Sequence, residues 1–190
     1  MLPTGLQCTE CYELLSFPSQ DRAYYIGSIE SPKAILESDY LGMQLDPIWC
    51  SDCSKPSWVE AIPSLRQLEK AFALVKSNLE IEYPFPSKFL STEEAISLLY
   101  DYLAWATKRK SKAKCVVCGK RNYTVLGGNL VKLRHKHCDY GVFKPTYTIS
   151  SHNAPMKTVI HNTEGEEIGR LSYWDEKLNG WSFIKADEST

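Results

Sequence analysis

Apolar residues recur at spacings of three and four in the middle of the chain, which is the period of an amphipathic helix. Each of two such segments follows a capping box, Ser64–Gln67 and Ser91–Glu94. The pattern predicts one helix from Leu65 to about Leu79 and a second that ends near Lys108. Tyr83-Pro84-Phe85-Pro86 separates them, and two prolines cannot continue a helix. We expect the two helices to form an antiparallel helical hairpin.

Shorter apolar runs separated by turn residues predict strands elsewhere. After Pro145, the segments 157–162, 167–174 and 180–185 predict a C-terminal antiparallel β-meander. Segments 122–126 and 130–134, joined by Gly127-Gly128-Asn129, predict a β-hairpin. Ser31-Pro32 offers an N-cap and a proline at the first helical position, which predicts a short helix through about Ser38. The predicted fold class is α+β.

Seven cysteines and one histidine lie at the spacing of metal ligands. Three CxxC pairs and one HxxC pair account for them: Cys8 and Cys11, Cys50 and Cys53, Cys115 and Cys118, His135 and Cys138. Disulfides, a redox CxxC and buried thiols are the alternatives. The odd number of cysteines and the lack of a secretory signal argue against disulfides. The spacing therefore predicts two sites, each with four ligands and one structural Zn²⁺.

The order of the pairs along the chain suggests how they combine. The predicted hairpin would bring the last two pairs together, giving a set of Cys115, Cys118, His135 and Cys138. The remaining set is Cys8, Cys11, Cys50 and Cys53. Cross-pairing between the sets is the alternative, and it is less favoured because the second set is local in sequence. His135 and His137 compete as the fourth ligand, and only His135 gives the HxxC spacing.

Both sets resemble zinc ribbons, modules in which two knuckles on β-hairpins hold one structural zinc ion. The resemblance covers about residues 5–58 and 113–141. It implies structural metal sites, and zinc ribbons as a class bind nucleic acid, bind protein or brace larger enzymes. We expect a split zinc-ribbon module at 1–58, the helical hairpin at 59–112, a second zinc-ribbon module at 113–146 and the meander at 147–190, packed into one body.

The charge is distributed unevenly along these segments. Residues 1–104 contain 7 Lys and Arg residues against 15 Asp and Glu residues, whereas residues 105–148 contain 11 against 1. The basic segment is explained either by a solvated surface or by a surface for phosphates or an acidic protein. Its candidate binding residues are Lys108, Arg109, Lys110, Lys112, Lys114, Lys120, Arg121, Lys132, Arg134 and Lys136.

The sequence gives little support for catalysis. Zinc with four protein ligands has no open position for water. His152-Asn153 and His161-Asn162 are residue types found in HNH nucleases, but the strand and helix context of that fold is absent around them. Met1–Gly5 has neither a basic nor an apolar signal region, and no apolar run reaches membrane length. We expect a non-enzymatic cytoplasmic protein.

Two binding roles remain. The run Pro47–Cys53, continued through Pro63-Ser64-Leu65, loosely resembles small bacterial immunity proteins encoded beside toxins. This resemblance implies a protein that binds and inhibits a toxin partner, and the acidic first half of the chain suits a basic partner. The alternative is nucleic-acid binding through the basic segment 105–148, with Tyr123 or Tyr140 stacking on a base. We favour the protein partner, because the acidic segments beside the basic one would oppose a polyanion.

Overall fold

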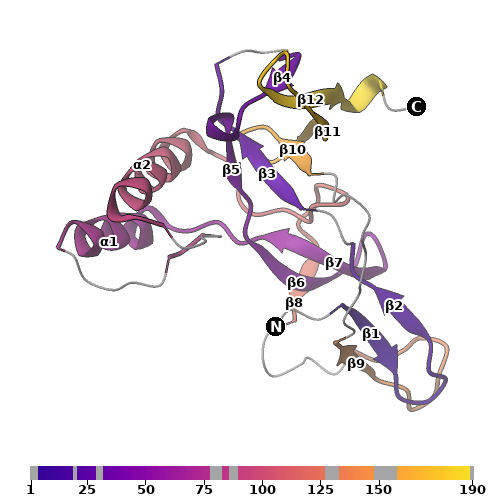
Figure 1. Ribbon diagram of the computed structural model, residues 1–190. Coiled ribbons are helices and arrows are strands. Elements are labelled where there is room, and N and C mark those ends of the chain that lie inside the picture. Colours follow the sequence, from indigo (N-terminus) through magenta and orange to yellow (C-terminus); the bar gives the residue numbers. More distant parts are fainter. Residues whose placement is uncertain are drawn as a thin grey trace. The chain divides into compact units, whose positions relative to one another are not determined.

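The computed structural model of the chain describes residues 4–18, 21–28, 32–77, 83–85, 90–126, 133–147 and 158–188. These residues form helices and several β-sheets, which confirms the α+β class (Figure 1). The chain divides into two compact units, each assembled from three separate stretches. Unit 1 comprises Met1–Ser19, Leu45–Glu60 and Ala113–Pro155, and unit 2 comprises Gln20–Gln44, Ala61–Lys112 and Met156–Thr190. Both units therefore combine stretches from several of the predicted sequence modules.

Unit 1 contains two three-stranded antiparallel sheets. One has the order β2-β1-β9, and its strands are Gly5–Cys8 (β1), Leu14–Ser16 (β2) and Phe143–Thr146 (β9). The other has the order β7-β6-β8, and its strands are Leu45–Cys50 (β6), Lys55–Glu60 (β7) and Tyr123–Val125 (β8). The rings of Phe17 and Trp58 pack at 4.6 Å between their centroids, and Trp58 Nε1 donates to the Pro18 carbonyl. These contacts join the ends of the two sheets.

Unit 2 contains a six-stranded sheet of order β4-β12-β11-β10-β3-β5. Its strands are Arg22–Tyr25 (β3), Ala34–Ile35 (β4), Tyr40–Gly42 (β5), Val159–His161 (β10), Glu167–Asp175 (β11) and Gly180–Lys185 (β12). Only the β10–β3 pair is parallel. Strands β10, β11 and β12 confirm the three predicted C-terminal strands, and the sheet core buries Ala23, Ile35, Ile160 and Leu171.

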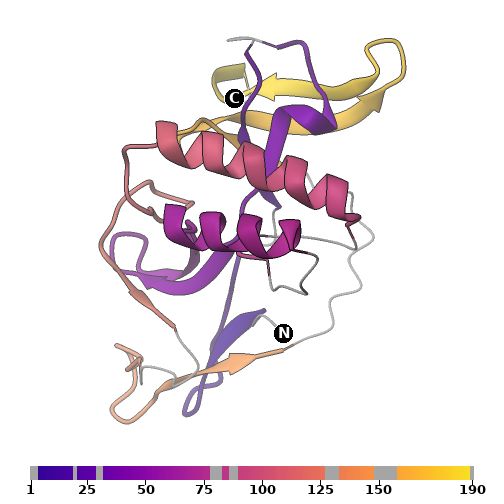
Figure 2. The same cartoon turned by 90° about the vertical axis from the view of Figure 1, so that its left-hand side faces the viewer.

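The two helices of unit 2 are Leu65–Lys76 (α1) and Thr92–Lys108 (α2), and they pack side by side (Figure 2). Both predicted capping boxes are present, at Ser64–Gln67 and Ser91–Glu94. Helix α2 also packs on the sheet, because the Trp105 and Tyr24 rings lie 4.3 Å apart and the Tyr102 hydroxyl donates to the Gly42 carbonyl. The aromatic residues of this helix therefore form core contacts, as their helical spacing predicts.

Two local predictions have a different outcome. The short helix expected to end near Ser38 is wrong, because strand β4 occupies Ala34–Ile35 and only the 3-10 turn Glu37–Asp39 (η1) follows. Ile35 pairs with Trp181 and is fully buried, so sheet packing overrides the local helix signal. The turn of the expected 122–134 hairpin and most of its second strand fall on residues 127–132, which lie outside the described residues. Strand β8, its first half, pairs with β6.

Candidate metal centres

The three CxxC loops share one backbone feature. The residue directly after the second cysteine has a positive φ in each of them: 63° at Tyr12, 51° at Ser54 and 69° at Gly119. A left-handed residue turns the chain sharply, and this lets both cysteines of a pair face the same point. Such a conformation is uncommon for tyrosine and serine. The same turn at all three positions indicates that the loops are shaped to present paired sulfurs.

The structure brings the ligand-type residues into two groups of four. The first, here called the histidine centre, contains Cys8, Cys11, His135 and Cys138. The second, the all-cysteine centre, contains Cys50, Cys53, Cys115 and Cys118. Within each group the ligand atoms lie within 4.8 Å of one another, so each group is positioned to hold one metal ion. All eight predicted ligands belong to a group, but the predicted grouping is wrong, and the cross-paired alternative is found.

Strand pairing explains why the ligand pairs combine differently from the prediction. Cys50, at the end of β6, lies opposite Tyr123 of β8, and Val59 forms a bridge to Cys115. These pairings carry the third CxxC loop to the second. Cys8, at the end of β1, lies opposite Phe143 of β9, and this pairing carries the HxxC segment to the first loop. Long-range sheet register, rather than proximity in sequence, therefore determines which loops come together.

The all-cysteine centre lies within a small apolar core. Cys50 and Cys115 are buried with Ile48 and Val59. The sulfurs of Cys50 and Cys118 lie 3.6 Å apart, and those of Cys53 and Cys115 lie 4.0 Å apart. The Ser57 hydroxyl, which is fully buried, lies 3.3 Å from the Cys115 sulfur and can donate a hydrogen bond to it. The centre is thus enclosed and has a polar partner at one sulfur.

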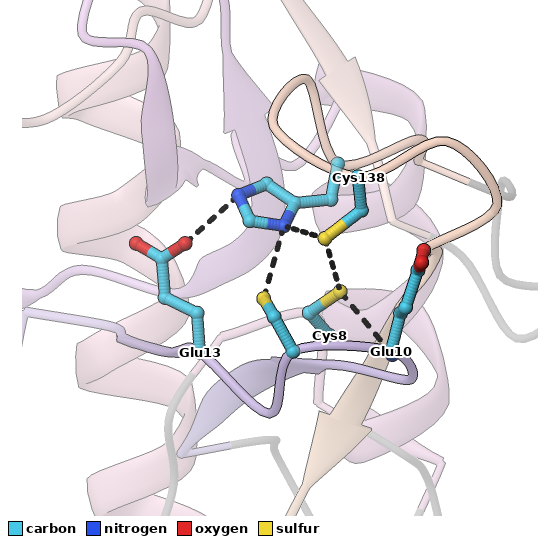
Figure 3. A network of polar contacts seen from close by, with 6 residues as sticks. Cys8, Glu10, Glu13 and Cys138 are labelled. Carbon is cyan, nitrogen blue, oxygen red and sulfur yellow. Dashed lines mark hydrogen bonds and ion pairs between the residues drawn. The ribbon is translucent and has the colours of Figure 1, made fainter.

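The histidine centre is more open. The Cys11 side chain is exposed, whereas Cys8 and His135 are buried. His135 Nδ1 lies 3.2 Å from the Cys138 sulfur and 3.4 Å from the Cys11 sulfur, and the Cys8 and Cys138 sulfurs are 3.8 Å apart. The sulfurs and this nitrogen therefore surround one point (Figure 3). His137 belongs to neither group, which resolves the choice of histidine in favour of His135.

A carboxylate holds the far side of the histidine ring. Glu13 Oε2 lies 2.8 Å from His135 Nε2, so the imidazole lies between this carboxylate and the sulfurs (Figure 3). The Glu13 backbone is also fixed, because its carbonyl accepts a hydrogen bond from the Cys8 N–H at 2.9 Å. In metal sites such a carboxylate fixes the orientation and tautomer of the ligating histidine.

Two further residues shape the loops around the histidine centre. A Cβ placed on Gly141 would lie 2.7 Å from both the Cys138 Cβ and the Cys8 sulfur, so only glycine fits there. Glu10 Oε2 accepts a hydrogen bond from the Tyr140 N–H, and the Glu10 N–H lies 3.5 Å from the Cys8 sulfur. The first loop is thereby tied to the segment that follows Cys138.

Aromatic rings connect the two centres inside unit 1. Trp49, the residue before Cys50, stacks on Phe143 with ring centroids 5.8 Å apart. Phe143 in turn packs against the His135 ring at 5.0 Å. A ligand of the histidine centre is therefore packed, through one intervening ring, against the strand that carries a ligand of the all-cysteine centre.

Hydrogen bonding gives the thiols within each centre different pKa values. Burial raises the pKa of Cys8, but hydrogen bonds from the backbone N–H groups of Cys11 and Glu10 outweigh burial and lower it to about 6. Burial also raises the pKa of Cys115, and the Ser57 hydroxyl with nearby backbone N–H groups lowers it to about 7. Burial and neighbouring thiols raise the pKa of Cys138 to about 12. One sulfur in each centre thus ionises readily, and a bound cation would favour ionisation of the others.

Glu13, Ser57 and Gly141 are not among the predicted site residues. Glu13 follows Cys11 by two residues, and an acidic residue so close to a ligand pair is a signal that could have been used. Gly141 follows Cys138 by three residues, so its glycine could also have suggested a crowded backbone. Ser57 gave no such signal, since only strand pairing brings it to Cys115.

The predicted basic residues are divided between the two units. Lys108, Arg109, Lys110 and Lys112 belong to unit 2, whereas Lys114, Lys120, Arg121, Arg134 and Lys136 belong to unit 1, and Lys132 lies outside the described residues. Several of them have local partners. The Arg109 guanidinium lies over the rings of Tyr24 and Trp105, and Lys120 pairs with Asp52 at 3.7 Å.

Of the two histidines considered for nuclease chemistry, the structure describes only His161. His161 is buried; its Nε2 lies 2.9 Å from Arg22 Nη1 and its Nδ1 lies 3.3 Å from the Gly165 carbonyl. These contacts fit a histidine within the sheet core. His152 lies outside the described residues.

Comparisons with known proteins do not place this chain in a family. No protein-family model, curated protein or solved structure matched the chain significantly. Within the described ranges, neither helix combines the length and the apolar character needed to cross a membrane.

Proposed function

We propose that both centres bind Zn²⁺ as structural sites. The observation that supports this is the spacing of the ligand atoms. Tetrahedral zinc with Zn–S bonds of about 2.3 Å and Zn–N bonds of about 2.0–2.1 Å separates two sulfurs by about 3.8 Å and a sulfur from a nitrogen by about 3.6 Å. The sulfur–sulfur distances of 3.6, 3.8 and 4.0 Å and the sulfur–nitrogen distances of 3.2 and 3.4 Å are close to these values.

Four protein ligands would occupy all the coordination positions of each zinc ion and leave none for a substrate or a reactive water. This supports a non-enzymatic role in which zinc stabilises the fold. Elemental analysis of freshly purified protein should give two zinc ions per chain. One ion or none would contradict the proposal.

We further propose that the zinc-braced protein binds and inhibits a basic protein partner. Support comes from two exposed apolar side chains of the β11–β12 hairpin in unit 2, here called the hairpin patch: Trp174 and Leu178, with exposed fractions of 41% and 47%. Exposed tryptophan and leucine side chains at one site are typical of protein-binding surfaces.

The turn that carries Leu178 is held in one conformation. Asp175 Oδ1 accepts hydrogen bonds from the N–H groups of Lys177 and Leu178, and Asn179 has a φ of 48°. Trp174 is supported by Trp181, whose ring lies 5.6 Å away at 85°. A preorganised surface loses little entropy on binding, which favours tight association.

Charge favours a basic partner for this patch. Unit 2 contains 14 Lys and Arg residues against 17 Asp and Glu residues, a net charge of −3. Glu176 and Lys177, which precede Leu178, are both exposed, so the negative charge belongs to the unit as a whole and not to the turn alone. A negative surface accelerates association with a positive one, and this effect weakens with salt.

A photo-crosslinking residue at position 178 of the full chain, expressed in the native host, tests this role. The captured protein is identified, purified and titrated directly. We expect a basic enzyme that loses activity on binding, with affinity at least tenfold weaker for Trp174→Ser. Tyr100→Ser is the matched control, because Tyr100 is 66% exposed on helix α2 of the same unit. An equal effect of both variants, or no direct binding, would refute the proposal.

Nucleic-acid binding is the second candidate, and one observation favours it. Tyr140, directly beyond the histidine centre, is 89% exposed and lies four residues after Lys136. Such a ring can stack on a base. Binding of single-stranded RNA or DNA should then weaken steeply with salt and be lost in the Tyr140→Ala, Lys136→Glu double variant. Absence of binding at low salt would exclude this candidate.

A further inference from the structure

The two centres differ in how their ligands are protected. In the all-cysteine centre every ligand is buried or partly buried, and the Ser57 hydroxyl beside it is fully buried. In the histidine centre Cys11 is exposed, which makes it the ligand residue most accessible to a competing ligand. The same centre has the one nitrogen ligand of the two sites, and that ligand is held by a carboxylate that is itself 47% exposed.

The contact between Glu13 and His135 controls which ring nitrogen faces the ion. A carboxylate accepts hydrogen bonds, so at 2.8 Å it favours a proton on His135 Nε2. Nδ1, 3.2 Å and 3.4 Å from the two nearest sulfurs, then keeps its lone pair for the metal. The Cys8 N–H bond to the Glu13 carbonyl holds the Glu13 backbone next to the loop that contains two of the cysteine ligands.

We propose that the histidine centre is the exchangeable metal site of this protein, and that Glu13 is the positioning residue that sets its rate of exchange. This inference rests on the proposal that both centres bind zinc. Cys11 would be the first ligand that an incoming chelator displaces, because it is the exposed member of the group, and its freed thiolate would take up a proton from water. Glu13 opposes the later loss of His135 by keeping Nδ1 aimed at the ion.

The test uses the full-length protein loaded with cadmium-113 and challenged with excess EDTA. Cadmium bound by four sulfurs and cadmium bound by three sulfurs and one nitrogen give separate resonances, so each centre is followed on its own. We expect the resonance of the histidine centre to disappear first. Removing an outer-shell partner of this kind costs about 10- to 100-fold in metal affinity. With the rate of metal binding unchanged, loss from this centre should accelerate by the same factor in Glu13→Ala, and the rate at the all-cysteine centre should stay the same.

Two variants separate positioning from a general effect on the loop. Glu13→Gln keeps a hydrogen-bond acceptor without the charge and should give a rate between those of the wild type and Glu13→Ala. Glu10→Gln removes a charge from the same loop but keeps a side-chain oxygen that can accept from the Tyr140 N–H, so it should accelerate metal loss much less than Glu13→Ala. Nitrogen-15 spectra should show His135 protonated at Nε2 in the wild type and a weakened preference in Glu13→Ala.

The possible failures are distinguishable. Two bound ions that leave together, or an all-cysteine centre that empties first, would overturn this inference alone. So would equal release rates in Glu13→Ala and the wild type, or acceleration by Glu10→Gln as large as that by Glu13→Ala. A protein that binds fewer than two ions from the start would instead overturn the proposed zinc-braced function.

Discussion

Substitution of Gly119 measures what the left-handed backbone conformation costs in a CxxC loop. Its φ is 69°, and a Cβ added there would have no atom within 4 Å. Gly119→Ala should therefore destabilise the protein through backbone strain alone, by about 1–2 kcal/mol. Thermal unfolding of the metal-loaded protein measures the change. Ser54→Gly relieves a similar conformation in the second loop and should not destabilise comparably, although it also removes the hydrogen bond from Ser54 Oγ to the Ser51 carbonyl.

Gly141 tests steric closeness instead of backbone strain. A Cβ here would lie 2.7 Å from the Cys8 sulfur, so Gly141→Ala should push the ligands of the histidine centre apart. We expect the bound metal to fall from two ions toward one per chain, as measured by elemental analysis. Gly119→Ala is the control, since it has room for its methyl group and should retain both ions. A Gly141→Ala protein with two tightly held ions would contradict this geometry.

At the scale of elements, the first turn of α2 should show a dependence on pH. Hydrogen bonds from the backbone N–H and side chain of Ser91 lower the pKa of the Glu94 carboxyl below its ordinary value. A carboxyl whose pKa is lower in the folded state stabilises the protein above its unfolded pKa, and this contribution is lost as pH falls through the folded pKa. Glu94→Gln should thus be destabilising at pH 7, and the difference from the wild type should shrink as the solution is acidified.

Denaturant unfolding of both proteins at several pH values checks this expectation. Gln67 occupies the same position in the capping box of α1 and carries no charge. Gln67→Ala should therefore give a loss of stability with little dependence on pH. A Glu94→Gln difference that stays constant down to pH 3 would show that the charge contributes nothing to the cap.

The elements that could be predicted are those whose signals are local. Capping boxes and apolar periodicity locate both helices, and turn residues locate the strands after residue 158. Strand β4 could not be predicted, because Ile35 becomes a strand residue through pairing with Trp181 nearly 150 residues away. The ligands follow the same rule. Their spacing identifies all eight, whereas their grouping depends on the pairing of β6 with β8 and of β1 with β9.

At the scale of the whole molecule, paired substitutions test the grouping directly. Cys8→Ser with Cys138→Ser removes two ligands from one centre, so this protein should retain one metal ion per chain. Cys8→Ser with Cys50→Ser damages both centres and should retain none. Elemental analysis of the two proteins, which have equal numbers of cysteines, separates the outcomes. The reverse result would restore the grouping by sequence proximity.

The grouping also determines the order in which the two ligand sets can be completed as the chain is synthesised. The two centres are nested in the sequence. Cys50 and Cys118 of the all-cysteine centre are 68 residues apart, and they lie within the 130 residues that separate Cys8 from Cys138 of the histidine centre. Closing the inner loop first roughly halves the chain left to be closed by the outer loop, which lowers its entropic cost by about 0.6 kcal/mol. During synthesis from the N-terminus, four cysteines therefore emerge before either centre has all of its ligands. Until residue 118 leaves the ribosome, those thiols have no complete set of partners and depend on a reducing environment or a transient carrier for protection.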